Sequence, residues 1–300
     1  NALSTAQVAA LTTDQLAASL GASSAGMGSD QIVALTTAQA AALTSAQTGA
    51  LGTAQVAAFE AMDAQSLSTQ AVLALDTAQI GALSTAAIAA LTTAQLVSGI
   101  ATDISGLTTS QIVALTTTQG SVLTSAQARA LSTLQLGAMT SADAASLSTQ
   151  AVFAMTSTQV GSFSTAAIAA LSTAQFSAGM GTNIVGFTTD QVVAMTTSQA
   201  AVLSSQQLGA LGSAQVGAFE TRDFEQLSTS AVQGIGTKIA GLSTAQIAAL
   251  TATQAAVLST EQARWLSTMQ IAALEAVDAQ SLSTQFLQAL SSTQVGALDT

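Results

Sequence analysis

Carboxylate pairs are the side chains in this sequence whose spacing could support chemistry. In three places a Glu and an Asp stand three residues apart, at Glu60 and Asp63, Glu220 and Asp223, and Glu275 and Asp278. Residues at i and i+3 share one face of a helix, so each pair would present its carboxylate oxygens together. Such hard oxygen ligands suit Ca²⁺, which takes six to eight of them. These six residues are therefore candidate metal ligands, with calcium as the candidate ion.

The same carboxylates also have a purely structural interpretation. Negative charge near a helix N-terminus interacts favourably with the helix dipole, so the Glu can replace a Ser or Thr cap and the Asp a capping Gln. A fourth copy of the pattern has Thr140 beside Asp143 and lacks the pair. The sequence leaves both interpretations open.

The composition excludes most other kinds of catalytic and metal-binding site. The chain has no His and no Cys, and charged residues make up only 6% of it. The commonest general base, the thiolate nucleophile and the preferred zinc ligands are therefore missing. We expect no enzyme activity and no cofactor. The net charge of -11 would repel a phosphate backbone, so nucleic acid is not an expected partner.

An eight-residue repeat organises the whole chain. Leu3-Ser-Thr-Ala-Gln-Val-Ala-Ala is followed in phase by Leu11-Thr-Thr-Asp-Gln-Leu-Ala-Ala, and Leu, Met, Phe or Ile opens 34 of 37 such octads. A longer period of ten octads relates Phe59, Met139 and Phe219, while Leu274 follows early, as if three octads and one residue had been lost. We predict one array over residues 1–300, cut from a longer one. Its predicted blocks are 3–82, 83–162, 163–241 and a shortened 242–300.

The octad predicts a very short helix. Eight residues of a continuous α-helix turn through about 800°, so the apolar stripe would spiral and face no single core. In a strand, the first and sixth positions would point to opposite faces. Ser4 with Gln7 forms a capping box, and Leu3 with Val8 a hydrophobic staple, so each octad carries its own helix start. The predicted fold class is an all-α solenoid of N-capped helices, one per octad; a β-solenoid is the alternative.

Packing follows from the same positions. Leu at the first position and Val, Ile or Leu at the sixth should form the core, with Ser, Thr and Gln on the outside. We expect two octads in each coil of the solenoid, and glycine-bracketed octads such as Gly99–Gly106 to redirect the winding. Hydroxyl and amide side chains recur in every octad, so no membrane-spanning segment is predicted.

The unit Leu-Thr-Thr-Ala-Gln-Ile/Val-Ala-Ala-Leu resembles the repeats of very long surface and secreted proteins of proteobacteria, some of them labelled adhesin-like. This resemblance covers the whole chain and implies an extracellular location at a bacterial cell surface. Locally, Leu11 to Ala18 is also similar to the helix start of the DNA-reading repeats of plant-pathogen effectors. Their Pro is absent here, the period is far shorter and the charge is acidic, so no DNA-reading residues are expected.

A structural role is the leading functional prediction. A surface nearly free of charge and of long flexible side chains loses little entropy on contact and meets little repulsion. We expect self-association into an extracellular filament, sheath or surface layer, with other cell-surface components as further partners. The alternative is an adhesin stalk or binding solenoid that engages a protein or glycan. That alternative requires an exposed aromatic or charged row that recurs every ten octads.

Overall fold

The chain is built from short helices. The computed structural model describes residues 3–20, 24–274 and 276–298. Within these residues every regular element is a helix of four to eight residues, so the predicted all-α class is confirmed and the β-solenoid alternative is wrong. No helix in the described part of the chain is long and apolar enough to cross a membrane.

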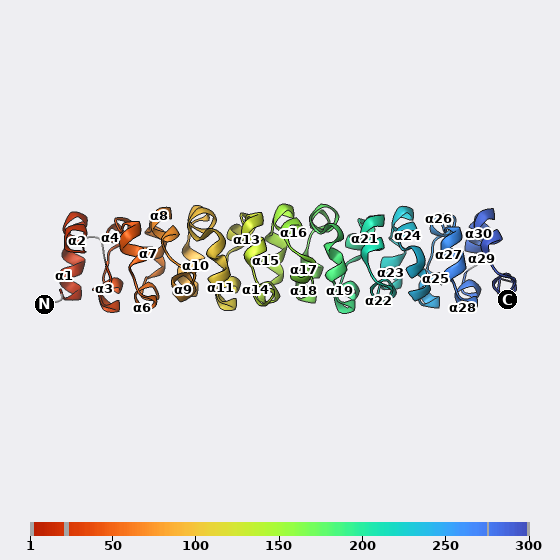
Figure 1. Cartoon of the computed structure of the whole chain (residues 1–300), viewed down its shortest axis with the longest axis horizontal. Coiled ribbons are helices and arrows are strands. Elements are labelled where there is room, and N and C mark those ends of the chain that lie inside the picture. Colours follow the sequence, from red (N-terminus) through yellow and green to blue (C-terminus); the bar gives the residue numbers. More distant parts are fainter. Residues whose placement is uncertain (1–2, 21–23, 275, 299–300) are drawn as a thin grey trace. The chain divides into compact units, whose positions relative to one another are not determined.

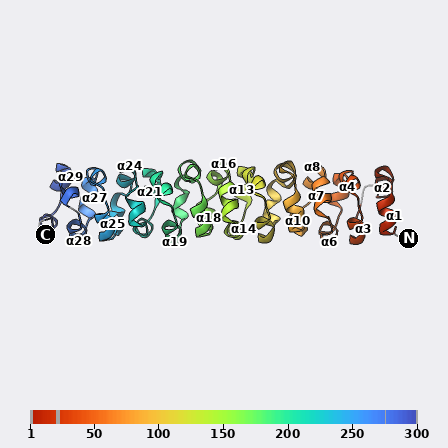
Figure 2. The ribbon, with the colours of Figure 1, turned by 180° about the vertical axis from the view of Figure 1, so that it is seen from behind.

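Two compact units divide the chain, Asn1–Ala154 and Met155–Thr300. Within each unit the helices follow one another in chain order (Figures 1 and 2). The first unit contains α1 (Thr5–Ala10), α2 (Thr13–Leu20), α3 (Ser29–Val33), α4 (Thr37–Ala41), α5 (Ser45–Gly49), α6 (Thr53–Val56), α7 (Ala61–Ser66), α8 (Thr69–Leu73), α9 (Thr77–Ala82), α10 (Thr85–Ala90), η1 (Gln95–Ile100), η2 (Ala101–Gly106), α11 (Thr109–Val113), α12 (Thr117–Ser121), α13 (Ser125–Ala130), α14 (Thr133–Ala138), α15 (Ser141–Ser146) and α16 (Thr149–Ala154). The second contains α17 (Ser157–Val160), α18 (Thr165–Ala170), η3 (Gln175–Gly179), η4 (Gly181–Gly186), α19 (Thr189–Val193), α20 (Thr197–Ala201), α21 (Ser205–Ala210), α22 (Ser213–Gly217), α23 (Thr221–Phe224), α24 (Thr229–Gly234), η5 (Gly236–Gly241), α25 (Thr244–Ala248), α26 (Ala252–Ala255), α27 (Thr260–Trp265), α28 (Thr268–Ala272), α29 (Ala276–Ser281), α30 (Thr284–Ala289) and α31 (Ser292–Val295).

Most helices start at the predicted capping box. At α4, the Thr36 hydroxyl accepts the Gln39 N–H at 3.3 Å, and Gln39 Oε1 accepts the Thr36 N–H at 2.8 Å. The cap residue is extended, with φ -82° and ψ 156°. Some helices, such as α9, end where the next octad opens in an extended conformation, here at Leu83 with φ -57° and ψ 145°; others, such as α4, end one residue before that position. The box therefore both starts a helix and interrupts the chain once per octad.

The same Gln has a second role that joins successive turns. Gln39 Nε2 donates to the carbonyl oxygens of Val8 and Leu11, each at 2.8 Å. These acceptors lie 31 and 28 residues earlier, and the two offsets recur along the array. Gln39 is 2% exposed. The expectation that Gln covers the outside is therefore wrong, because its amide is needed between the turns.

One turn of the solenoid takes between three and four octads. Neighbouring helices such as α7 and α10, or α13 and α16, are three octads apart along the chain. A Cβ placed on Gly81 would meet the carbonyl oxygen of Gly106, later in the chain, and one on Gly106 would meet that of Thr77. These contacts join positions 25 and 29 residues apart, which is between three and four octads. The expected coil of two octads is therefore wrong. Two octads alone would not enclose the apolar first and sixth positions of each octad.

The ten-octad period corresponds to three such turns. In the first unit, α8 and α16 begin ten octads apart, and both lie along the upper edge of Figures 1 and 2. Helices α3 and α11 likewise share the lower edge of Figure 1. The block therefore returns equivalent residues to the same side of a unit. The segment lost before Leu274, three octads and one residue, equals the separation of Gly81 and Gly106, which is one turn.

The predicted core positions are confirmed. Leu83 opens its octad at 4% exposure, and Ile88, in the sixth position, is fully buried. Full burial of such a side chain stabilises the fold by about 1.5–3 kcal/mol. Because an isolated helix of this length is unstable in water, this packing and the Gln bonds between turns hold the helices together.

Glycine octads replace α-helix with other helix types. Where two full octads separate Leu91 from Leu107, the chain forms the π-helix η1 and then the 3₁₀-helix η2. Where one residue is missing from the two octads between Leu227 and Leu242, α24 stands in place of the π-helix. A π-helical turn accommodates one residue more than an α-helical turn, so this local change absorbs the difference in length. The 3₁₀-helices each begin at positive φ, at Ala101 (47°), Gly181 (50°) and Gly236 (57°).

Candidate functional site

The acidic octads occupy the capping positions of their helices. Glu60 is the N-cap of α7 and Glu220 that of α23, and neither side chain accepts a cap hydrogen bond. Asp63 and Asp223 stand where most octads have Gln, and both are buried. Glu60 and Glu220 therefore stand at the N-cap, and Asp63 and Asp223 at the position of the capping Gln, as the structural interpretation predicts. The two Glu side chains, however, do not cap the helices by a hydrogen bond.

The unpaired Asp143 behaves differently. Its Oδ2 accepts the Thr140 hydroxyl at 2.6 Å and the Thr140 N–H at 3.2 Å, which closes a capping box. Here Asp does replace the capping Gln. In the last acidic octad Asp278 is buried, while Glu275 lies outside the described residues.

Burial changes the acidity of two of these carboxyl groups. Desolvation raises the pKa of Asp63, and the nearby charge of Glu60 raises it further. Desolvation also raises the pKa of Asp223, where Arg222 opposes the shift and Glu220 adds to it. Both aspartates therefore hold a proton to higher pH than a solvated Asp does.

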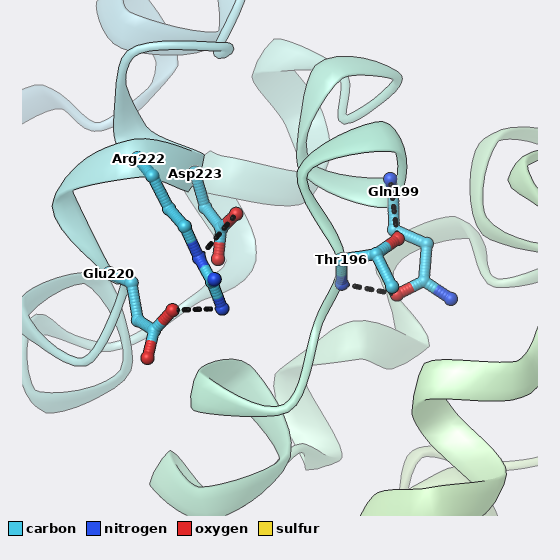
Figure 3. A network of polar contacts seen from close by, with 5 residues as sticks. All are labelled: Thr196, Gln199, Glu220, Arg222 and Asp223. Carbon is cyan, nitrogen blue, oxygen red and sulfur yellow. Dashed lines mark hydrogen bonds and ion pairs between the residues drawn. The ribbon is translucent and has the colours of Figure 1, made fainter.

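Arg222 gives one acidic octad a distinct electrostatic character. Its Nη2 lies 2.5 Å from Glu220 Oε2, and its Nε lies 3.9 Å from Asp223 Oδ1 (Figure 3). Both carboxylate oxygens of Asp223 are buried without a hydrogen bond. Figure 3 contrasts this site with the neighbouring box of Thr196 and Gln199, in which the Gln oxygen is bonded at 2.8 Å.

A hollow of about 350 Å³ lies beside Arg222. Its wall is formed by Arg222 and by residues 193–197, which include Thr196 and Thr197. Met195 in this wall precedes Asp223 by the same offset at which a Gln amide bonds a carbonyl elsewhere, as Gln191 bonds Phe163. Because the Asp side chain has no N–H to donate, the Met195 carbonyl receives no such amide bond from Asp223. The hollow is lined by one Arg, two Thr and three apolar residues.

The carboxylate pairs offer only part of a calcium site. Two carboxylates supply at most four oxygens, fewer than the six to eight that Ca²⁺ takes. Among the described residues, no group of three or more His, Cys, Asp or Glu side chains could hold a metal ion. At Glu220 and Asp223, Arg222 already supplies positive charge. Calcium binding stays a prediction that titration can test.

Two residues of the glycine octads make the hydrogen bond between turns that Gln makes elsewhere, a role that the sequence did not predict. Asn183 Nδ2 donates to the Met155 carbonyl at 2.8 Å, 28 residues earlier. Lys238 Nζ donates to the Gly209 carbonyl. The only signal in the sequence is their place in the repeat: Asn183 holds the fifth position, which Gln holds elsewhere, and Lys238 the equivalent place in the shortened octad.

The residues that mark the ten-octad period do not form the exposed aromatic row that the adhesin alternative requires. Phe59, Met139 and Phe219 are at most 3% exposed and belong to the core. Other large apolar side chains are exposed, including Leu73 at 45% and Phe153 at 58%, which are ten octads apart. Two exposed apolar side chains therefore recur ten octads apart, but at the seventh position of the octad rather than the first.

Comparison with known families is consistent with this architecture. The model of the ALTTAQ repeat matches residues 25–61, 56–93 and 184–221. No curated protein gives a significant match. Residues 34–39 read Ala-Leu-Thr-Thr-Ala-Gln, and the final Gln39 is the residue that closes the capping box and bonds the preceding turn. Residues 25–93 and 184–221 of the chain are therefore similar to the ALTTAQ repeat.

Proposed function

We propose that this protein is a structural, non-catalytic repeat array that self-associates into an extracellular filament, sheath or surface layer. The observation that carries the proposal is the recurrence of one joint, in which a Gln amide bonds the turn before it. The same bond recurs between turns within each unit, and stability in such arrays sums over neighbouring contacts. Further turns can therefore be added to such an array with the same hydrogen bond between turns.

Surface chemistry supports association. Charged side chains make up 6% of the chain, and exposed positions are dominated by Ser, Thr, Ala and Gly. Little side-chain entropy is lost when such a surface is covered. The bacterial cell-surface location rests on the resemblance of the octad to surface and secreted repeat proteins. On this proposal the principal partner is a further copy of the chain, with other cell-surface components as additional partners and no nucleic acid.

Sedimentation velocity over a wide range of protein concentration tests the proposal. We expect the average sedimentation coefficient to rise with concentration, and to rise equally in calcium and in a chelator. A single monomeric species at every concentration would contradict self-association. Assembly only in calcium would instead assign the acidic octads a metal-dependent role.

A binding solenoid is the second candidate, favoured by the hollow beside Arg222. The guanidinium group of Arg222 and the hydroxyl groups of Thr196 and Thr197 could together recognise the hydroxyl groups of a glycan. Screening the intact chain against a glycan array, with R222Q as the variant and R129Q as the matched control, tests this role. Binding lost only in R222Q would favour it, and no binding by the wild type would remove the support.

A further inference from the structure

Arg222 places a positive charge between the two carboxylates of an acidic octad. Its Nη2 lies 2.5 Å from Glu220 Oε2, and its Nε lies 3.9 Å from Asp223 Oδ1 (Figure 3). Asp223 is fully buried, and neither of its carboxylate oxygens accepts a hydrogen bond. A buried carboxylate is costly unless positive charge or hydrogen bonds compensate for it. In this octad the chain supplies that positive charge itself.

The equivalent octad of the first unit has both carboxylates without the guanidinium group. Residues 59–63 read Phe-Glu-Ala-Met-Asp, so Met62 stands where the second unit has Arg222. Asp63 is 3% exposed, and Glu60 is near enough for its charge to raise the pKa of Asp63. Within the stretches that the structure describes, neither of these side chains has an ion pair or a hydrogen bond. Helices α4 and α10, which pack against α7, contain no charged residue that could compensate.

Backbone oxygens of the preceding turn gather at the same place in an ordinary octad. The carbonyl oxygens of Leu83, Gly81 and Ile80 lie 2.6, 3.2 and 3.2 Å from Gln111 Nε2. These acceptors precede the Gln by 28, 30 and 31 residues. Ca²⁺ contacts its oxygen ligands at about 2.3–2.6 Å, only a little closer. The winding of the chain therefore directs several carbonyl oxygens at one point.

Asp63 stands where such an amide would be. The same three offsets lead from Asp63 to Leu35, Val33 and Ile32, and Gln55 in the preceding octad keeps two of these offsets. Asp63 has no N–H to donate, and the Leu35 carbonyl oxygen accepts no hydrogen bond from any described residue. Carbonyl and carboxylate oxygens thus meet here without a donor or a positive charge between them.

We propose that Glu60 and Asp63 bind a Ca²⁺ ion together with the carbonyl oxygens of residues 32, 33 and 35. The carboxylates offer up to four oxygens and the carbonyl groups three, which matches the six to eight that Ca²⁺ takes. Mg²⁺ fits less well, because it demands near-ideal octahedral geometry at shorter distances. The ion supplies the positive charge that Arg222 supplies in the second unit, and it joins α7 to the end of α3. All these ligands belong to one copy of the chain, so the site does not depend on self-association.

Two substitutions at exposed positions test the site. M62R adds the guanidinium group that the second unit already has, and E60Q removes one charged ligand. M269R and D190N are the matched controls, because Met269 and Asp190 are exposed and lie outside the acidic octads. Isothermal titration with calcium chloride should show a site in the wild type and both controls, weakened roughly tenfold or more in M62R and E60Q. Calcium should raise the thermal midpoint of the wild type but not that of M62R. Circular dichroism should show all four variants folded.

The reverse substitution tests the comparison between the two octads. R222M removes the guanidinium group, so it should add one calcium site to the chain. A wild type that binds no calcium, or binding that M62R and E60Q leave unchanged, would overturn the proposal. Failure of R222M to gain a site would show that Arg222 does not replace an ion, and would remove the basis of the proposal. None of these failures affects self-association, which is expected to be equal in calcium and in a chelator.

Discussion

Gln111 bonds Leu83 across one turn of the solenoid, with 2.6 Å between Gln111 Nε2 and the Leu83 carbonyl oxygen. The same amide lies 3.2 Å from the Ile80 carbonyl oxygen, and Gln111 Oε1 accepts the Thr108 N–H at 2.7 Å. One side chain therefore starts its own helix and holds the end of an earlier one. This joint explains why Gln, rather than Glu, fills the capping box.

Replacing Gln111 with Glu separates the two roles. Glu is a good partner in a capping box but cannot donate to carbonyl oxygens, and its charge would be buried. We expect Q111E to lower the free energy of unfolding by about 3 kcal/mol. Urea titration followed by circular dichroism measures the loss. Q7E is the control, because Gln7 is exposed and closes its own box. Equal effects of the two variants would show that the bonds between turns add nothing.

Gly186 marks a close approach of two backbones. A Cβ there would overlap the Ser157 carbonyl oxygen, so the turns must separate to admit it. G186A should destabilise the second unit by about 1–3 kcal/mol, the usual range for overpacking a tight contact. In G26A the new Cβ meets nothing within 4 Å, and thermal unfolding should change little. A neutral G186A would contradict the contact between these turns.

Ala101 occupies a conformation that suits glycine. Its φ of 47° places it at the start of η2, where Gly181 and Gly236 hold the equivalent positions in η4 and η5. A101G should stabilise the first unit by about 1 kcal/mol, and G181A should destabilise the second by a similar amount. Urea unfolding of both variants provides the measurement. Destabilisation by A101G would mean that the backbone is not held at positive φ.

Acid should stabilise this fold through Asp63. Its pKa is raised in the folded protein, so folding favours the protonated carboxyl group. This contribution is fully present below the pKa of an unfolded Asp and is lost as pH rises through the higher folded pKa. Urea titrations of wild type and D63N between pH 3 and pH 7 compare the two. The stability of wild type relative to D63N should increase on acidification; a decrease would contradict the burial of this carboxyl group.

Local features of the fold could be predicted from the sequence because they depend on neighbours within one octad. The box of Thr36 and Gln39 spans four residues, and its chemistry specifies a helix start directly. The core positions of Leu83 and Ile88 follow from the same register. The number of octads in a turn does not, because it depends on bonds such as that from Gln39 to Leu11, 28 residues away. The burial of Gln was missed for the same reason.

The candidate site was predicted in part. Spacing correctly placed Glu60 and Asp63 at the start of one helix, yet it could not show that Asp63 is buried or that Glu60 makes no cap bond. Nothing in the sequence indicated the hollow beside Arg222, because Val193 and Thr197 reach it only through the winding of the chain. Exposure of Leu73 and Phe153 depends equally on the path of the turns.

Negative-stain electron microscopy of the concentrated full chain tests the central claim most directly. If the array is a self-associating structural element, images should show filaments, sheets or regular lateral bundles, and these should persist in a chelator. Dispersed single particles at all concentrations would contradict the claim and leave the binding solenoid as the better account of the protein.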